Sequence, residues 1–177
     1  MAQAEIKDRL AKKIRDIEDF PKKGIIFRDI TPLLQDKVSF REAVRVIADH
    51  YRGKNISCVV SPEARGFILG AAVAYELGVG FIPVRKPGKL PYKVEKMRYN
   101  LEYGEDEVQI HKDAISKGDN VLVFDDVIAT GGTARATCKL VEKLGGKVVG
   151  VCFLIELTDL KGKEKLAEYD VFSIIKY

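Results

Sequence analysis

Short apolar runs and amphipathic stretches alternate along most of the chain. Runs rich in branched residues predict buried strands, and apolar positions spaced by three and four residues predict helices. The predicted strands cover 56–61, 79–85, 120–126, 147–157 and 171–176, and the predicted helices cover about 39–51, 65–77 and 133–146, with Ser39 as an N-cap and Gly78 closing the second helix. Strands that are apolar almost throughout must be covered on both faces. The pattern therefore predicts an α/β fold, a mostly parallel twisted sheet flanked by helices.

The N-terminal part departs from this alternation. Ile6, Leu10, Ile14 and Ile17 share one helical face and predict an amphipathic helix. Residues 19–32 are interrupted by two prolines and a glycine, which predicts a loop.

A polar stretch at about 86–106 also departs from the alternation of strands and helices. Pro87, Gly88, Pro91 and Gly104 interrupt this stretch, and only a short strand at 108–110 is expected after it. Segments of this length without regular structure are usually functional lids or disordered. We therefore expect a flexible loop here.

Length and composition restrict the class of protein. A chain of 177 residues is large enough for one domain with a real core, so we expect a single domain over 1–177. No apolar run approaches a membrane span, and the charged N-terminus does not resemble a secretory signal. Cys58, Cys138 and Cys152 lie in apolar contexts typical of reduced thiols, and no Cys and His spacing suits zinc. We expect a cytoplasmic protein with no membrane partner.

The stretch VLVFDDVIATGGTA at 121–134 carries the most specific chemistry. Ligands of open parallel sheets bind beyond the carboxyl ends of strands, where helices begin. Backbone N–H groups, hydroxyls, glycines free to adopt positive φ and a helix N-terminus suit a phosphate, and the loop that offers them is Ala129, Thr130, Gly131, Gly132 and Thr133. Asp125 and Asp126 would repel a phosphate and instead suit sugar hydroxyls. The segment predicts a sugar phosphate site; the plainer alternative is a polar strand end before a glycine turn.

The same stretch resembles the signature of the type I phosphoribosyltransferases, which bind 5-phosphoribosyl 1-pyrophosphate. Further segments resemble the adenine-specific members of that family in the same order: FPKKGIIFRDITPLL, EARGFILG, VRKPGKLP, LEYG and ELTDLKGKEKL. The resemblance covers about 14–177, with one departure at Glu63 and Ala64, where some members carry Asp-Ser. It implies the type I fold, a homodimer, and transfer of the phosphoribosyl group to adenine. The products would be AMP and pyrophosphate, as in purine salvage.

The resemblance also implies how the substrates are held. Asp125 and Asp126 would contact the ribose hydroxyls, and the loop 129–133 would hold the 5′-phosphate. Residues 1–34 would supply an N-terminal helix and a hood over the base. The adenine-binding residues would be Ile26, Phe27, Arg28 and Leu157, with Phe27 and Leu157 on the two faces of the ring. Backbone groups of Ile26 and Arg28 would read the N6 amino donor and the N1 acceptor, a pattern that hypoxanthine reverses.

The remaining assignments concern the leaving group and the chemistry. The pyrophosphate would be bound by cations after two strands, namely Arg65, Arg85, Lys86 and Lys89. The catalytic residues implied are Glu102, Tyr103 and Arg65, with Glu102 placed to accept the N9 proton of adenine. The loop at 86–106 would close over the reaction. Mg²⁺ is the expected cofactor, bound mainly by substrate oxygens and water rather than by a dedicated set of protein ligands.

Two other functions stay open at this point. A phosphoribosyltransferase for hypoxanthine, xanthine or orotate would share the motif at 121–134 but not GIIFRD and EARGF together. A non-catalytic regulator with this fold would need a nucleic-acid-binding face. The net charge of +4 is spread along the chain rather than gathered in a stripe, so we expect no nucleic acid partner.

Overall fold

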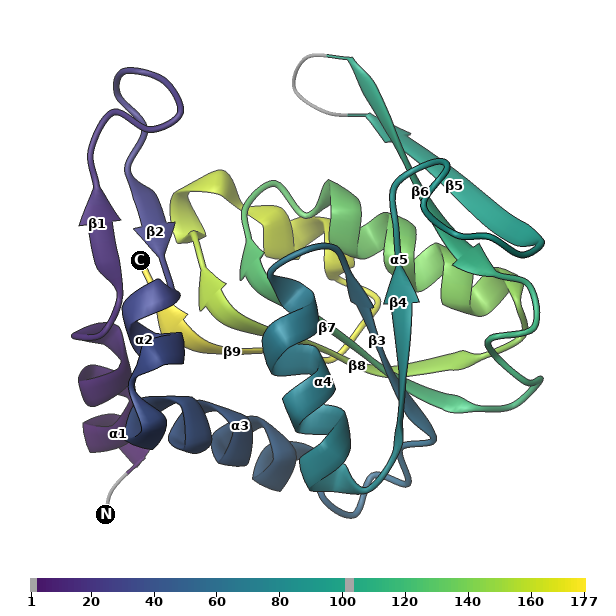
Figure 1. Ribbon diagram of the computed structural model, residues 1–177, viewed down its shortest axis with the longest axis horizontal. Coiled ribbons are helices and arrows are strands. Elements are labelled where there is room, and N and C mark those ends of the chain that lie inside the picture. The colour runs from purple at the N-terminus through teal and green to yellow at the C-terminus, as the bar shows by residue number, and fades with distance from the viewer. Residues whose placement is uncertain (1–2, 101–103) are drawn as a thin grey trace.

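The computed structural model describes residues 3–100 and 104–177, and a five-stranded sheet forms its centre (Figure 1). The strands stand in the order β4 (Gly80–Val84), β3 (Cys58–Pro62), β7 (Asn120–Ile128), β8 (Lys147–Glu156) and β9 (Val171–Lys176). All four neighbouring pairs are parallel. The predicted fold class, α/β with a mostly parallel sheet, is therefore confirmed.

Helices cover both faces of this sheet (Figure 1). On one face lie α3 (Lys37–Tyr51) and α4 (Gly66–Leu77), and on the other lies α5 (Gly132–Lys143). Successive residues of β7 point to opposite faces, so Leu122 and Phe124 pack in the cluster with α3 and α4, whereas Val121 and Val123 pack in the cluster with α5. Both faces of the central strand are thus buried over residues 121–124, which explains why these four residues are all apolar. No helix of the described residues is long and apolar enough to cross a membrane.

The N-terminal region forms more regular structure than the sequence predicted. The helix α1 (Gln3–Ala11) ends early, and β1 (Arg15–Ile17) pairs antiparallel with β2 (Phe27–Asp29), followed by α2 (Thr31–Gln35). The expectation of one helix through Ile17 was therefore wrong, and the expected loop over 19–32 is confirmed for 19–26 but wrong for 27–32. Strands of three residues carry too short a pattern to detect, and this pair is held by tertiary contacts, as between Arg15 and Asp29 at 2.6 Å.

The second half of the polar stretch at 86–106 enters a β-hairpin, whereas residues 86–93 form no helix or strand. The strands of this hairpin are β5 (Val94–Asn100) and β6 (Glu105–His111), paired antiparallel along their whole length. The expectation of a segment without regular structure was wrong for these residues. The cause is the outward polarity of the hairpin, in which only alternate residues such as Met97 and Tyr99 pack on the core beside α5. Figure 1 shows this hairpin and the β1–β2 pair projecting on the same side of the molecule, at opposite ends.

The ends of the helices test the predicted caps. Gly78 ends α4 in the left-handed conformation, with φ 72°, as expected for a glycine C-cap. Ser39 was the wrong choice for the N-cap of α3. That position belongs to Asp36, whose carboxylate accepts a hydrogen bond from the Ser39 amide at 2.8 Å. Two short 3₁₀ helices, η1 (Thr158–Leu160) and η2 (Gly162–Leu166), connect β8 to β9.

Candidate active site

The strand order creates a crevice between β3 and β7. The chain leaves β3 for β4 on one side of this point and leaves β7 for β8 and β9 on the other. The pairing of β3 with β7 ends at Val60 and Val123, whereas β7 continues beside β8 as far as Ile128 and Glu156. The two strands therefore separate at their carboxyl ends, at the topological switch point where open α/β sheets bind ligands.

A cavity of 330 Å³ lies at this point and collects many of the predicted site residues. It is lined by Pro62, Glu63, Ala64, Arg65, Val84, Lys86, Val108, Asp125, Asp126, Val127, Ala129 and Thr133. A hollow of 90 Å³ adjoins it within the loop that precedes α5, lined by Asp125 and residues 127–134. A more open hollow of 520 Å³ lies on the β5–β6 hairpin, but neither β3 nor β7 contributes to it. The 330 Å³ cavity and the 90 Å³ hollow share lining residues and together extend from Arg65 to the start of α5.

Asp126 is buried, and the adjacent Asp125 is half-buried. Burial, together with the neighbouring charge of Asp126, raises the pKa of Asp125 well above its ordinary value of 3.8. Burial also raises the pKa of Asp126, against the opposing effect of Arg65, whose Nε lies 2.8 Å from Asp126 Oδ2. The two residues lie inside β7 and not after its end, because the strand continues to Ile128.

Two polar atoms of this ion pair are left for another partner. Asp126 Oδ2 and Arg65 Nη1 are buried, and within the described parts of the chain neither makes a hydrogen bond. The 2.8 Å approach of Arg65 to Asp126 is therefore an ion pair without hydrogen-bond geometry. Buried polar atoms are normally satisfied, so this pair suits a ligand that brings hydroxyl donors and anionic oxygens.

The loop before α5 is built for close approach of backbone. Gly131 is the N-cap of α5 and lies in the left-handed region, with φ 77°. A Cβ there would overlap the carbonyl oxygen of Gly162, and a Cβ at Gly162 would overlap that of Ala129. Gly132, in contrast, does not have a positive φ, so that expectation was wrong for this residue. Its hydrogen faces the Tyr99 ring, where a Cβ would lie 3.1 Å from a ring carbon.

Three of the predicted base-binding residues, Ile26, Phe27 and Arg28, lie in or next to β2 of the hood formed by β1 and β2. The Phe27 ring packs edge-on against Phe20, with centroids 5.1 Å apart, and carries the Arg65 guanidinium 4.8 Å from its centroid. Ile26, just before β2, is 48% exposed and so is available to a ligand. Phe27 and Arg65 bring the hood into contact with the start of α4.

Two residues assigned to the base have other contacts. The Arg28 side chain forms an ion pair with Asp16 and lies over the Tyr177 ring at 3.8 Å, so it connects the hood to the residue that follows β9. Leu157 directly follows β8, and its amide donates to the Ile128 carbonyl at 3.0 Å. Its side chain packs on the cluster that contains Ile30, on the hood side of the sheet.

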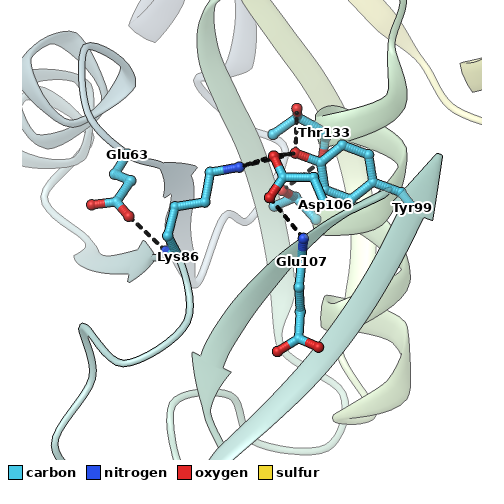
Figure 2. Close-up of polar contacts among 7 residues, drawn as sticks. Glu63, Lys86, Tyr99, Asp106, Glu107 and Thr133 are labelled. Atoms are coloured by element: carbon cyan, nitrogen blue, oxygen red, sulfur yellow. Dashed lines mark hydrogen bonds and ion pairs between the residues drawn. The ribbon is translucent and has the colours of Figure 1, made fainter. Parts of the chain in front are cut away.

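Besides Arg65, the three other cations predicted for pyrophosphate have different environments. Arg85 donates to Glu63 Oε2 from Nε at 2.9 Å and from Nη2 at 2.7 Å. The Lys86 amide donates to Glu63 Oε1 at 2.6 Å, and the Lys86 side chain forms an ion pair with Asp106 (Figure 2). Lys89 is exposed. Of these three, only Lys86 lines the 330 Å³ cavity. The predicted catalytic residues Glu102 and Tyr103 lie outside the described residues.

Sequence reasoning missed several residues that shape the site. Glu63 was noted only as a departure from a family pattern, yet it holds both Arg85 and the Lys86 amide. Tyr99 and Gly162 come from segments distant in sequence from the loop 129–133 that they contact, and Asp106 contacts Lys86 and Tyr99. The only available signal was the glycine in the segment ELTDLKGKEKL, which the resemblance had already singled out without giving it a role.

Comparison with known proteins now places the chain. Residues 30–177 match the family model described as the phosphoribosyl transferase domain, so the chain belongs to the phosphoribosyltransferase family. Within this family it groups with the adenine phosphoribosyltransferases. The enzyme of that name from Clostridium kluyveri is 59% identical over 168 residues, covering 95% of this chain and 98% of the relative.

Solved structures agree with this placement. The adenine phosphoribosyltransferase of Thermoanaerobacter pseudethanolicus superposes with a TM-score of 0.94 at 51% identity, covering 97% of this chain and 99% of the other. That of Saccharomyces cerevisiae, a complex with an imino-altritol bisphosphate and adenine, has a TM-score of 0.93 at 39% identity, with the same coverage.

Proposed function

We propose that this site transfers the phosphoribosyl group of 5-phosphoribosyl 1-pyrophosphate to adenine, giving AMP and pyrophosphate. The observation that carries the proposal is the joint position of Asp125, Asp126 and the Gly131-capped loop at the switch point of the sheet. Carboxylates that suit hydroxyls lie next to a helix N-terminus that suits a phosphate, which is the order of groups along a ribose 5-phosphate. The adenine in the yeast complex supports the choice of base.

The ribose 5-phosphate half would be held by β7 and α5. Asp126 Oδ2 is buried and pairs with Arg65 without accepting a hydrogen bond, so a ribose hydroxyl would donate the hydrogen bond that it lacks. The 5′-phosphate would accept hydrogen bonds from the backbone and hydroxyls of the loop formed by Ala129, Thr130, Gly131, Gly132 and Thr133. The N-terminal end of α5 adds a favourable dipole.

The base would lie under the hood. Phe27 would stack on adenine through the ring face that the Arg65 guanidinium does not cover, and Arg65 links this position to the ribose site. Leu157 would bound the other face of adenine. Backbone groups of Ile26 and Arg28 would select the N6 donor and N1 acceptor of adenine. The contacts of the Arg28 side chain with Asp16 and Tyr177 support a backbone role for this residue.

The reaction would displace pyrophosphate at the anomeric carbon through an oxocarbenium-like transition state. Arg65 and Lys86 line the cavity and would balance the charge of the departing group, with Arg85 and Lys89 on the same loop nearby. Glu102 would accept the N9 proton, and Tyr103 would lie beside it. The roles of Glu102 and Tyr103 rest on the family motif alone.

Mg²⁺ is the proposed cofactor, and it would neutralise charge on the pyrophosphate oxygens. Among the described residues, no three His, Cys, Asp or Glu side chains gather as a metal site. The nearest candidates are Asp125 and Asp126, two carboxylates that also serve the ribose. This donor set suits an ion that arrives with the substrate and keeps most of its ligands as phosphate oxygens and water. A homodimer and a cytoplasmic location are proposed from the family resemblance.

A base-specificity assay tests the proposal. Purified protein would be incubated with the ribosyl donor, Mg²⁺ and adenine, hypoxanthine, guanine, xanthine or orotate, and the nucleotide and pyrophosphate would be measured separately. We expect AMP and pyrophosphate in equal amounts, with adenine preferred by about a hundredfold or more, from two mismatched buried hydrogen bonds. Comparable use of another base would refute the adenine assignment, and no nucleotide from any base would support a non-catalytic regulator.

A further inference from the structure

Tyr99 and Asp106 of the β5–β6 hairpin contact two residues that are proposed to bind substrate phosphates, Thr133 and Lys86 (Figure 2). The Asp106 carboxylate forms an ion pair with the Lys86 ammonium, which lines the active-site cavity. The Tyr99 hydroxyl lies 3.0 Å from Thr133 Oγ1 in the loop proposed for the 5′-phosphate. The hairpin therefore contacts both ends of the proposed site for the ribosyl donor.

The hydrogens of this network can be assigned without conflict. Lys86 has only donors, so it donates to Asp106 and, at 3.3 Å, to the Tyr99 oxygen. Tyr99 donates its own hydrogen to Asp106 Oδ2 at 3.0 Å and accepts from Thr133. The second oxygen, Asp106 Oδ1, accepts from the Glu107 amide at 2.8 Å. The carboxylate thus makes the kind of contacts that a phosphate oxygen would make.

The charges of this pair are mutually stabilised. Burial alone would raise the pKa of Asp106, but hydrogen bonds from Lys86, the Glu107 amide and Tyr99 hold it below its ordinary value. Burial alone would lower the pKa of Lys86, but the contacts with Asp106 and Tyr99 raise it. Both groups are therefore charged at neutral pH. Their side chains are 27% and 39% exposed, so the attraction is partly screened by water.

We propose that Asp106 is an internal competitor for the pyrophosphate group of the substrate, holding Lys86 until the donor or pyrophosphate displaces it. This inference rests on the proposed function, because it takes Lys86 as a pyrophosphate ligand. Lys86 already donates to Asp106 and Tyr99, and a carboxylate and a diphosphate that share one ammonium repel each other. Binding of the diphosphate therefore weakens the contact with Asp106, which lowers the affinity and loosens a tie between the hairpin and the site.

The opposite role would be that Asp106 positions Lys86 for the ligand. The two roles predict opposite signs. If Asp106 competes, removing its charge strengthens pyrophosphate binding; if it positions Lys86, removing its charge weakens binding. A measurement of affinity therefore decides between them, and catalysis is not needed for the readout.

The experiment is calorimetric titration of the full-length protein with pyrophosphate at fixed Mg²⁺. We expect Asp106→Asn to lower the Kd by about 3- to 10-fold, the range for releasing one partly screened charged hydrogen bond. The matched control is Glu105→Gln, which removes the same charge from the neighbouring exposed residue and should change the Kd by less than about twofold. Tyr99→Phe keeps the ring against Gly132 but removes the hydroxyl, and should give a smaller decrease in Kd.

A second comparison isolates Lys86. In a Lys86→Met background, the Asp106→Asn substitution should no longer change the Kd, since the competition needs both partners. An unchanged or higher Kd in Asp106→Asn alone overturns the inference, and so does an equal decrease with Glu105→Gln or in the Lys86→Met background. If the wild type and Asp106→Asn both fail to bind pyrophosphate, the proposed function itself is wrong. Circular dichroism of each variant verifies that the fold is retained.

Discussion

The guanidinium of Arg65 lies over the ring of Phe27, 4.8 Å from its centroid. Arg65 precedes α4 at the carboxyl end of β3, whereas Phe27 belongs to the hood, and Arg65 Nε also lies 2.8 Å from Asp126. One arginine therefore contacts both the proposed base site and the proposed ribose site. An adenine that stacks on Phe27 would be adjacent to the groups that hold the sugar, as transfer between them requires.

Substitutions at Phe27 and Arg28 test stacking on the base and selection of the base separately. Phe27→Ala should lower kcat/KM for adenine by about 2- to 10-fold, the value of one aromatic stacking contact, without admitting hypoxanthine. Arg28→Ala should keep the preference for adenine, because its side chain contacts Asp16 and Tyr177 and the backbone reads the base. The measurement is kcat/KM for adenine and hypoxanthine on both variants. A gain of hypoxanthine use by Arg28→Ala would show that the side chain selects the base.

Asp125 is expected to lower the stability of the ligand-free protein. Its folded-state pKa is raised above 3.8, so the folded protein resists losing a proton that the unfolded chain releases. Stability should therefore fall as pH rises from about 3.8 to the raised value, and Asp125→Asn should remove this loss. We expect a higher Tm than wild type at pH 7 and a difference that shrinks towards zero near pH 4.

The same variant should bind the ribosyl donor at least about tenfold more weakly, because an amide presents one acceptor oxygen in place of a carboxylate. Thermal melts at several pH values, and donor titrations at pH 7, measure the two effects. A lower Tm at pH 7 with unchanged donor affinity would mean that Asp125 serves the fold and not the ligand.

Gly131→Ala should be more damaging than an ordinary glycine substitution. The position has a positive φ, and a Cβ would also overlap the carbonyl of Gly162. Gly78→Ala is the matched control, since Gly78 has φ 72° but no atom within 4 Å of its added Cβ. We expect a loss of about 1 kcal/mol in unfolding free energy for Gly78→Ala and roughly 2–4 kcal/mol for Gly131→Ala. Equal losses in urea melts would mean that the contact with Gly162 yields easily.

Glu63→Gln should loosen the loop that carries the pyrophosphate cations. Glu63 holds Arg85 through two hydrogen bonds and the Lys86 amide through a third. We expect KM for the ribosyl donor to rise by about 5- to 10-fold, from losing charge-assisted hydrogen bonds, with KM for adenine nearly unchanged. Glu76→Gln, which affects only a 3.6 Å surface pair with Arg52, should alter neither. A rise in both KM values would indicate a general loss of structure.

The sequence by itself determined the parallel sheet and the loop before α5. The buried strands of the sheet are apolar almost throughout. A strand that is buried on both faces needs apolar residues at nearly every position, whatever its place in the sheet. Asp125, Asp126 and the glycine loop are contiguous, so their chemistry could be recognised without any knowledge of distant contacts. The same locality made Gly78 a safe prediction, since a left-handed helix end needs glycine whatever surrounds it.

Only the tertiary structure decided what depends on residues far apart in the chain. The β5–β6 hairpin is polar outside and its apolar positions are few, so its pairing is set by packing against α5. Asp36 could displace Ser39 as the cap of α3 because both are good caps, and the backbone alone selects one. Glu63, Tyr99 and Asp106 acquire their roles from partners 7 to 34 positions away. Their side chains come into contact only when the chain has folded, and no local sequence pattern predicts these contacts.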